Sequence, residues 1–188
     1  MRRLTIPISK TFQPSPLLTN ITQFDTRVFL WCVNSRHQIT LAKTARLISR
    51  SGDGYLQLAL PLLLALLGGK AGESLLLCTL LAFSIQLPIY WILKNSFQRQ
   101  RPPDAIPSFA SVITAHDKFS FPSGHTAAAT LLAALVYLHF GAMAAPLMMW
   151  AGLVGASRVL LGVHFPTDIL AGAVLGLTVA SISVSLLG

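Results

Sequence analysis

Three short polar stretches stand out in a chain that is otherwise rich in apolar residues. They read KNSFQRQRP (residues 94–102), PSGH (122–125) and SRVLLGVHFPTD (157–168). Together they contain cationic side chains, two histidines, a carboxylate and a Ser-Gly turn, a combination that can bind and transfer an anionic group. The candidate site residues are Lys94, Arg101, Ser123, Gly124, His125, Arg158, His164 and Asp168.

The cations and the PSG turn predict a phosphate-binding site. Arginine presents a planar fork of donors that matches phosphate oxygens, and lysine supplies a compact point charge. The PSG turn exposes backbone N–H groups at a helix start, where the helix dipole also favours an anion. Gly124 allows a ligand to approach the backbone closely.

His164 and Asp168 are four residues apart at the start of an apolar segment. This spacing lets the carboxylate accept a hydrogen bond from one ring nitrogen, which would leave the other nitrogen as a nucleophile. Simpler interpretations are snorkelling arginines at the ends of membrane spans and a histidine that caps a helix. A metal site formed by His125, His164 and Asp168 is disfavoured because three cations lie close by.

The composition indicates that these residues are positioned by membrane helices. Of the 188 residues, 53% are hydrophobic and only 11% are charged, whereas soluble domains average about 25% charged residues. We therefore predict an all-α integral membrane bundle of about five transmembrane helices plus N-terminal interfacial helices. The five apolar segments are 55–67, 75–93, 126–140, 144–161 and 169–187.

Alternation of the five spans places the polar stretches together. The end of the second span, the start of the third, the end of the fourth and the start of the fifth should share one face. Residues 1–22 are predicted to be a flexible tail, and residues 23–188 a single membrane domain. Charges interrupt the helical pattern of residues 24–50, which is typical of helices that lie in the interface.

The three motifs resemble the signature of the type 2 phosphatidic-acid phosphatase superfamily, K-x6-R-P, P-S-G-H and S-R-x5-H-x3-D, with every invariant position present and in order. The resemblance implies that His164 attacks phosphorus to form a phosphohistidine and that Asp168 orients it. His125 would protonate the departing oxygen and then activate water, with no metal or other cofactor. The phosphoryl oxygens would be held by Lys94, Arg101, Arg158, Ser123 and the Gly124 amide.

The function predicted is a membrane lipid phosphatase. Undecaprenyl pyrophosphate, phosphatidylglycerophosphate, phosphatidic acid and lipid A phosphate are all candidate substrates. A lipid-to-lipid phosphotransferase would use the same residues, and an anion or lipid transporter is an alternative from another class. A haloperoxidase is disfavoured by the five apolar spans.

The expected partners are the lipid substrate and the bilayer, with no obligatory protein partner. The net charge of +8 indicates attraction to anionic lipid headgroups; nucleic acid is not expected, because basic and aromatic residues do not interleave. The expected location is the cytoplasmic membrane of a bacterium, as a multi-pass protein. With five spans, the basic N-terminal region shares a side with the site, and the positive-inside rule then favours the cytoplasm. Substrate binding also requires cations, however, and bacterial members mostly act on the outer leaflet, so we favour the extracytoplasmic face.

Overall fold

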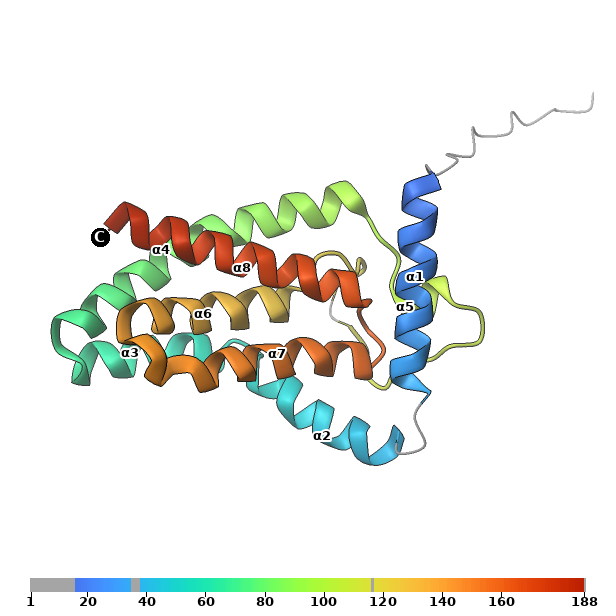
Figure 1. Cartoon of the computed structure of the whole chain (residues 1–188), viewed down its shortest axis with the longest axis horizontal. Helices are drawn as coiled ribbons and strands as arrows, with labels where there is room; N and C mark the ends of the chain where they lie inside the picture. Colours follow the sequence, from blue (N-terminus) through green and yellow to red (C-terminus); the bar gives the residue numbers. More distant parts are fainter. Residues whose placement is uncertain (1–15, 35–37, 116, 188) are drawn as a thin grey trace, which may run out of the picture.

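The computed structural model describes residues 16–34, 38–115 and 117–187, and every regular element in these ranges is helical (Figure 1). This confirms the all-α prediction for the described chain. Residues 1–15 of the predicted tail lie outside the described ranges, and the first helix begins at Pro16, within the stretch predicted as tail. The elements are α1 (Pro16–Val33), α2 (Gln38–Ser51), α3 (Tyr55–Leu67), α4 (Gly69–Phe97), α5 (Pro102–Ala105), α6 (Gly124–Phe140), the 3-10 helix η1 (Gly141–Ala144), α7 (Ala145–Leu160) and α8 (Pro166–Leu187).

Helix α6 is the centre of the bundle. It packs against α4, α7 and α8, and its residues from Ala129 to Val136 are all buried. Helices α3 and α4 form a tight antiparallel pair, whose turn contains Gly69 at a φ of +58°, a conformation that glycine adopts without strain. The outer surfaces of α3, α4 and α8 expose large apolar side chains, including Leu66, Leu80 and Leu170, as expected of helices that face lipid.

Two glycines bring α8 close to α6. A Cβ atom at Gly172 would lie 2.5 Å from the Ser123 carbonyl oxygen, and one at Gly176 would lie 2.5 Å from that of Ala127. Small residues four apart allow membrane helices to approach closely. The first turn of α8, which contains Asp168, is therefore held against the start of α6.

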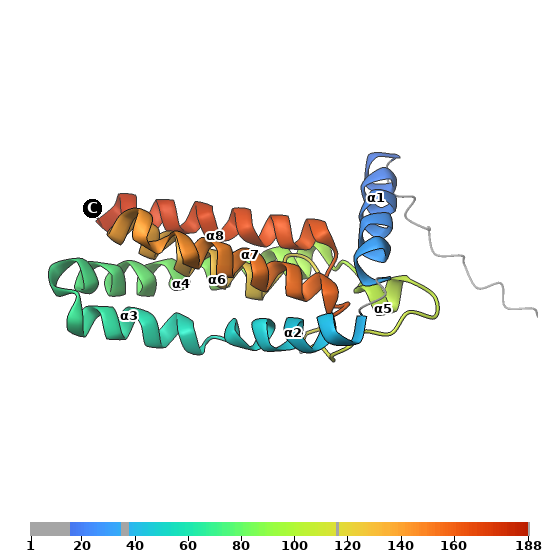
Figure 2. The ribbon, with the colours of Figure 1, turned by 60° about the horizontal axis from the view of Figure 1, so that its bottom comes forward.

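The helices have the length and composition of membrane segments. Residues 69–105, 124–160 and 166–187 are each long and apolar enough to cross a membrane, and α3 is a shorter apolar helix. The η1 turn divides residues 124–160 into α6 and α7, which run side by side in opposite directions (Figures 1 and 2). The structure thus has a helix at each predicted apolar segment, and the number of crossings remains a prediction.

Helix α1 lies crosswise to the bundle at one end (Figures 1 and 2). It exposes Phe24 and Trp31 while burying Asp25 and Phe29, which fits the predicted interfacial helix. Helix α2 instead packs on α7 and leads into α3 along the side of the bundle (Figure 2).

Candidate active site

The three polar stretches meet at the end of the bundle that α1 crosses (Figure 1). Lys94 lies in the last turn of α4, and Ser123 caps the start of α6. Arg158 lies in the last turn of α7, and Asp168 in the first turn of α8. The helix ends predicted to coincide from alternation therefore do so.

Lys94 and Arg101 converge on Asp117, which lies in the long connection between α4 and α6. Lys94 donates to one carboxylate oxygen and Arg101 to the other, and the Tyr90 hydroxyl donates to the oxygen shared with Lys94 at 2.8 Å. Burial raises the pKa of Asp117, but the hydrogen bonds and charges of these neighbours outweigh burial and lower it to about 2. The two cations thus already bind a planar oxyanion, the chemistry that a phosphoryl group requires.

Arg101 also connects the cations to His164. Its Nη1 donates to the Val163 carbonyl at 2.6 Å and lies 3.5 Å from His164 Nε2. Because a guanidinium only donates, the Nε2 atom that faces it carries a lone pair. Burial lowers the pKa of His164 to about 4, although Asp168 opposes the shift. His164 is therefore a neutral imidazole at pH 7, with its Nε2 lone pair beside the cations.

Asp168 lies beside the other ring nitrogen but beyond hydrogen-bond length. Its Oδ2 is 3.6 Å from His164 Nδ1, so the predicted hydrogen bond is not formed in this geometry. The reason is that Oδ2 accepts the Phe165 N–H at 2.8 Å, while Oδ1 accepts from Arg99 at 2.8 Å. Within the described residues the buried Nδ1 has no other partner, and catalytic hydrogen bonds often tighten only when substrate binds.

A buried ion-pair network holds Asp168 in place. Arg99 donates to Asp168, to the Thr167 hydroxyl at 2.7 Å and to Asp25 of α1. Asp25 also accepts the Thr167 N–H at 3.0 Å, and its side chain is fully buried. Because a buried carboxylate is costly unless it is paired, this network ties α1 to the start of α8. Sequence reasoning missed both Asp25 and the role of Arg99.

The second histidine has its own carboxylate partner. His125 Nε2 lies 2.8 Å from Asp53 Oδ1, in the turn between α2 and α3. Arg158 donates to the Ser49 hydroxyl of α2 at 2.6 Å, and it lines one cavity together with His125. Helix α2 and the turn after it thus complete the site on the side of His125, which the sequence motifs did not indicate.

Ser123 and Gly124 shape the start of α6. The Ser123 hydroxyl accepts from the Thr126 hydroxyl at 3.0 Å. The backbone N–H of Ser123 donates to the Asp168 carbonyl at 3.0 Å. Ser123 is fully buried, and these hydrogen bonds fix the turn, while its direct role in holding phosphate stays a prediction. A Cβ at Gly124 would lie 3.1 Å from the Tyr90 ring. The first-turn N–H groups, which a helix leaves without internal partners, belong to Gly124 and His125.

The chain is similar to known proteins in sequence and in fold. A sequence model described as the PAP2 superfamily matches residues 73–188, a range that contains all three motifs. The decaprenylphosphoryl-5-phosphoribose phosphatase of Mycobacterium tuberculosis is 36% identical over 91 residues, which are 48% of this chain and 49% of that protein. The chain thus spans about half the length of the curated relatives that it matches first.

Two crystal structures resemble most of the chain. LpxE of Aquifex aeolicus superimposes with a TM-score of 0.68 and 29% identity, covering 85% of this chain and 94% of that chain. A transmembrane PAP2-type phosphatidylglycerolphosphate phosphatase from Bacillus subtilis gives a TM-score of 0.70 and 27% identity, covering 89% and 86%.

Proposed function

The chain belongs to the PAP2 superfamily, and on this premise we propose that it is a membrane phosphatase that hydrolyses a lipid phosphate or lipid pyrophosphate. The observation that carries the proposal is the neutral, buried His164, whose Nε2 lone pair lies beside Arg101 in the cation cluster. The apolar outer surface of the bundle supports a lipid substrate. Two similar proteins also support a lipid substrate, since their names describe phosphatases of a decaprenyl-linked sugar phosphate and of phosphatidylglycerolphosphate.

In the first step, His164 Nε2 attacks phosphorus and the bond from phosphorus to the leaving oxygen breaks. Lys94, Arg101 and Arg158 hold the remaining phosphoryl oxygens, and the Gly124 N–H lies at the same helix start. Asp168 stabilises the imidazolium that forms, because its carboxylate lies on the Nδ1 side of the ring. His125 gives a proton to the leaving oxygen.

In the second step, water attacks the phosphohistidine and His125 accepts the proton from that water. The bond between phosphorus and Nε2 breaks, so that neutral His164 and inorganic phosphate are regenerated. We propose that no metal is required, because the three side-chain cations supply the charge stabilisation that Mg²⁺ gives in other phosphoryl transfers.

The proposal is tested by phosphate release from purified protein in detergent with excess chelator. Phosphatidic acid, phosphatidylglycerophosphate and undecaprenyl pyrophosphate form the substrate panel. We expect inorganic phosphate from at least one of them, at a rate that chelator does not change. Absence of release from all three, or activity that returns only with a divalent metal, would contradict the proposal. Transfer of the phosphoryl group to a second lipid instead of water would identify a phosphotransferase.

Asp117 competes with the substrate for Lys94 and Arg101, since its carboxylate uses donors that the phosphoryl oxygens need. Replacing it by asparagine removes the negative charge, so we expect inorganic phosphate to inhibit Asp117→Asn more strongly. The carboxylate is 42% exposed, and we expect a decrease in the inhibition constant of roughly fivefold, about 1 kcal/mol. Asp104→Asn, an equal charge change at an exposed site in α5, is the control. Weaker inhibition of Asp117→Asn would mean that Asp117 positions the cations instead.

We also propose that the site faces the extracytoplasmic side of a bacterial cytoplasmic membrane. A cysteine at the exposed Ala110, in the connection next to the site, reports the side directly. In intact spheroplasts an impermeant thiol reagent should label Ala110→Cys in a Cys32→Ser background. Protection of this cysteine until the cells are lysed would place the site in the cytoplasm.

A further inference from the structure

A basic cavity adjoins the candidate active site on the side of His125. It has a volume of about 280 Å³, and its walls come from α2, the connection before α6, the start of α6 and the end of α7. Only two of its lining residues, His125 and Arg158, belong to the three sequence motifs. The polar lining consists of Arg46, Ser49, Arg50, Asp53, Thr114, His125 and Arg158.

The charges of this lining favour an anion. Three arginines face a single acidic residue, Asp53, which is already paired with His125. Arg46 donates to the Val112 carbonyl at 2.9 Å, so its guanidinium is fixed in the wall. Arg158 is 5% exposed, and its Nε has no hydrogen-bond partner among the described residues.

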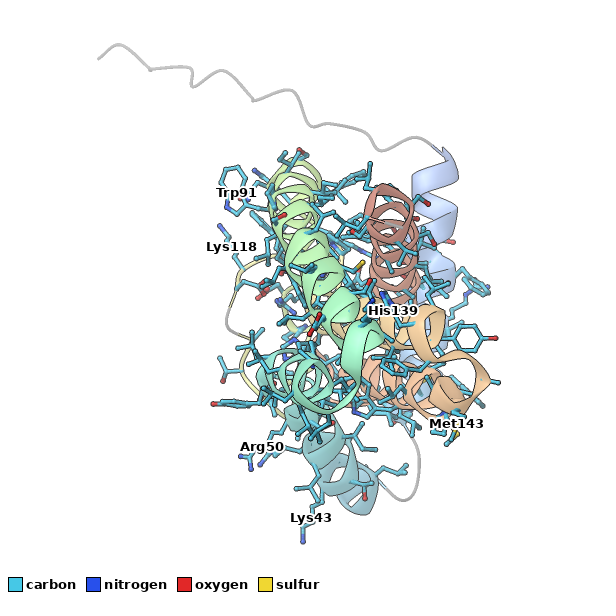
Figure 3. The ribbon with its side chains drawn as sticks, turned by 90° about the vertical axis from the view of Figure 1, so that its left-hand side faces the viewer. Lys43, Arg50, Trp91, Lys118, His139 and Met143 are labelled. Carbon is cyan, nitrogen blue, oxygen red and sulfur yellow. The ribbon has the colours of Figure 1, made fainter. Side chains whose placement is uncertain are left out.

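Arg50 is the cation of this cavity that is available to a ligand. It is exposed, and its side chain makes no hydrogen bond or ion pair with any described residue. In Figure 3, Arg50 and Lys118 of the connection before α6 both project on the left-hand side of the view, whereas Lys43 of α2 points down, away from them. Lys43 does not line the cavity.

The position of His125 indicates which part of a substrate reaches the cavity. In the proposed reaction His125 protonates the leaving oxygen, so the group attached to that oxygen must lie next to His125. His125 lines this cavity, and so do Arg46 and Arg50 of α2. We propose that the cavity is a subsite for a second phosphate, carried by the leaving group of the substrate. This inference rests on the proposed function and narrows it to lipids with two phosphates, such as a lipid diphosphate.

The same arginines could bind phosphate from another source, the headgroup of a neighbouring anionic lipid. That source would help the protein to bind its membrane and would act equally on every substrate. A subsite for the leaving group acts only on substrates that carry the second phosphate. The two sources therefore differ in whether the effect of removing Arg50 depends on the substrate.

The test compares farnesyl diphosphate with farnesyl monophosphate in a neutral detergent, for the wild type and for Arg50→Gln. For Arg50→Gln we expect kcat/KM for the diphosphate to fall roughly tenfold, because one charge-assisted hydrogen bond is lost. We expect kcat/KM for the monophosphate to fall less than about twofold. For each substrate the measured quantity is the ratio of the wild-type kcat/KM to that of Arg50→Gln. The two ratios are compared, and not the rates themselves, because a phosphate is a better leaving group than an alcohol in any enzyme. Lys43→Gln, with the same charge change on the same helix, should leave both values unchanged.

Equal losses for the two substrates, or no loss for either, would overturn the subsite while leaving the proposed function intact. Equal losses would assign Arg50 to the transferred phosphate, which both substrates carry, and no loss for either would fit a headgroup site, because the neutral detergent supplies no anionic lipid. If the wild type hydrolysed neither substrate nor any lipid of the panel above, the proposed function would fail, and the subsite with it.

Discussion

His164→Ala should lose essentially all turnover with every substrate, on the order of 10⁴-fold or more, as expected when a covalent nucleophile is removed. The physical reason is that, among the described residues, His164 is the histidine within hydrogen-bond distance of Arg101. Without it the phosphohistidine cannot form, and the two-step reaction cannot proceed. The measurement is kcat for phosphate release under saturating substrate, with circular dichroism to establish that the variant is folded.

His139→Ala is the matched control for this loss. His139 lies near the end of α6 that is remote from the site, as the end-on view shows (Figure 3). It interacts with Ser74 and the Leu135 carbonyl. We expect His139→Ala to keep turnover close to that of the wild type. Substantial turnover in His164→Ala, with the control active, would mean that water attacks phosphorus directly.

His125→Ala should show a loss that depends on the leaving group. General acid catalysis contributes roughly 10²–10⁴-fold, and its contribution is largest for a poor leaving group such as a lipid alkoxide. A nitrophenolate leaves without a proton, so p-nitrophenyl phosphate should still phosphorylate His164 in this variant. Hydrolysis of the phosphohistidine also needs His125, so one burst of nitrophenol should be followed by very slow turnover.

Stopped-flow absorbance measures this burst directly. Its amplitude should approach one nitrophenol per active site in His125→Ala, and it should vanish in His125→Ala/His164→Ala. A uniform loss with both leaving groups and no burst would show that His125 is not the acid, and that its pair with Asp53 serves the structure of the α2–α3 turn.

The sequence predicted the helices and the meeting of the three motifs because both depend on local signals. Apolar segments such as 126–140 are long enough to identify, and alternation across a membrane then determines which helix ends coincide. The spacing of His164 and Asp168 placed the two residues correctly near one another. It could not predict that Phe165 and Arg99 would occupy the carboxylate oxygens and leave a gap of 3.6 Å.

The partners that lie outside the motifs were missed, because their contacts join distant parts of the chain. Asp25 pairs with Arg99 across 74 positions, and Asp53 meets His125 across 72. Asp117 lies in a connection without any periodic pattern. The composition did contain one signal for these acidic partners. The chain has only six acidic residues, and four of them gather at the site: Asp25, Asp53, Asp117 and Asp168.

Ser123 shows a different limit of motif reasoning. A serine before a helix start is both a frequent phosphate ligand and a frequent N-cap, and the sequence does not distinguish the two. In the structure the Ser123 hydroxyl accepts from the Thr126 hydroxyl and the Ser123 N–H donates to the Asp168 carbonyl, which fits an N-cap, while the phosphate role stays a prediction. Close packing of α8 on α6, made possible by Gly172, explains why the N–H is used in this way.

The most direct test of the central claim is rapid-quench trapping with a substrate labelled in the transferred phosphate, followed by peptide mapping. We predict an acid-labile, base-stable label on the peptide that contains His164. The label should be transient in the wild type, persistent in His125→Ala and absent from His164→Ala. A label that persists in His164→Ala and is lost in His125→Ala would reverse the two roles and contradict the account.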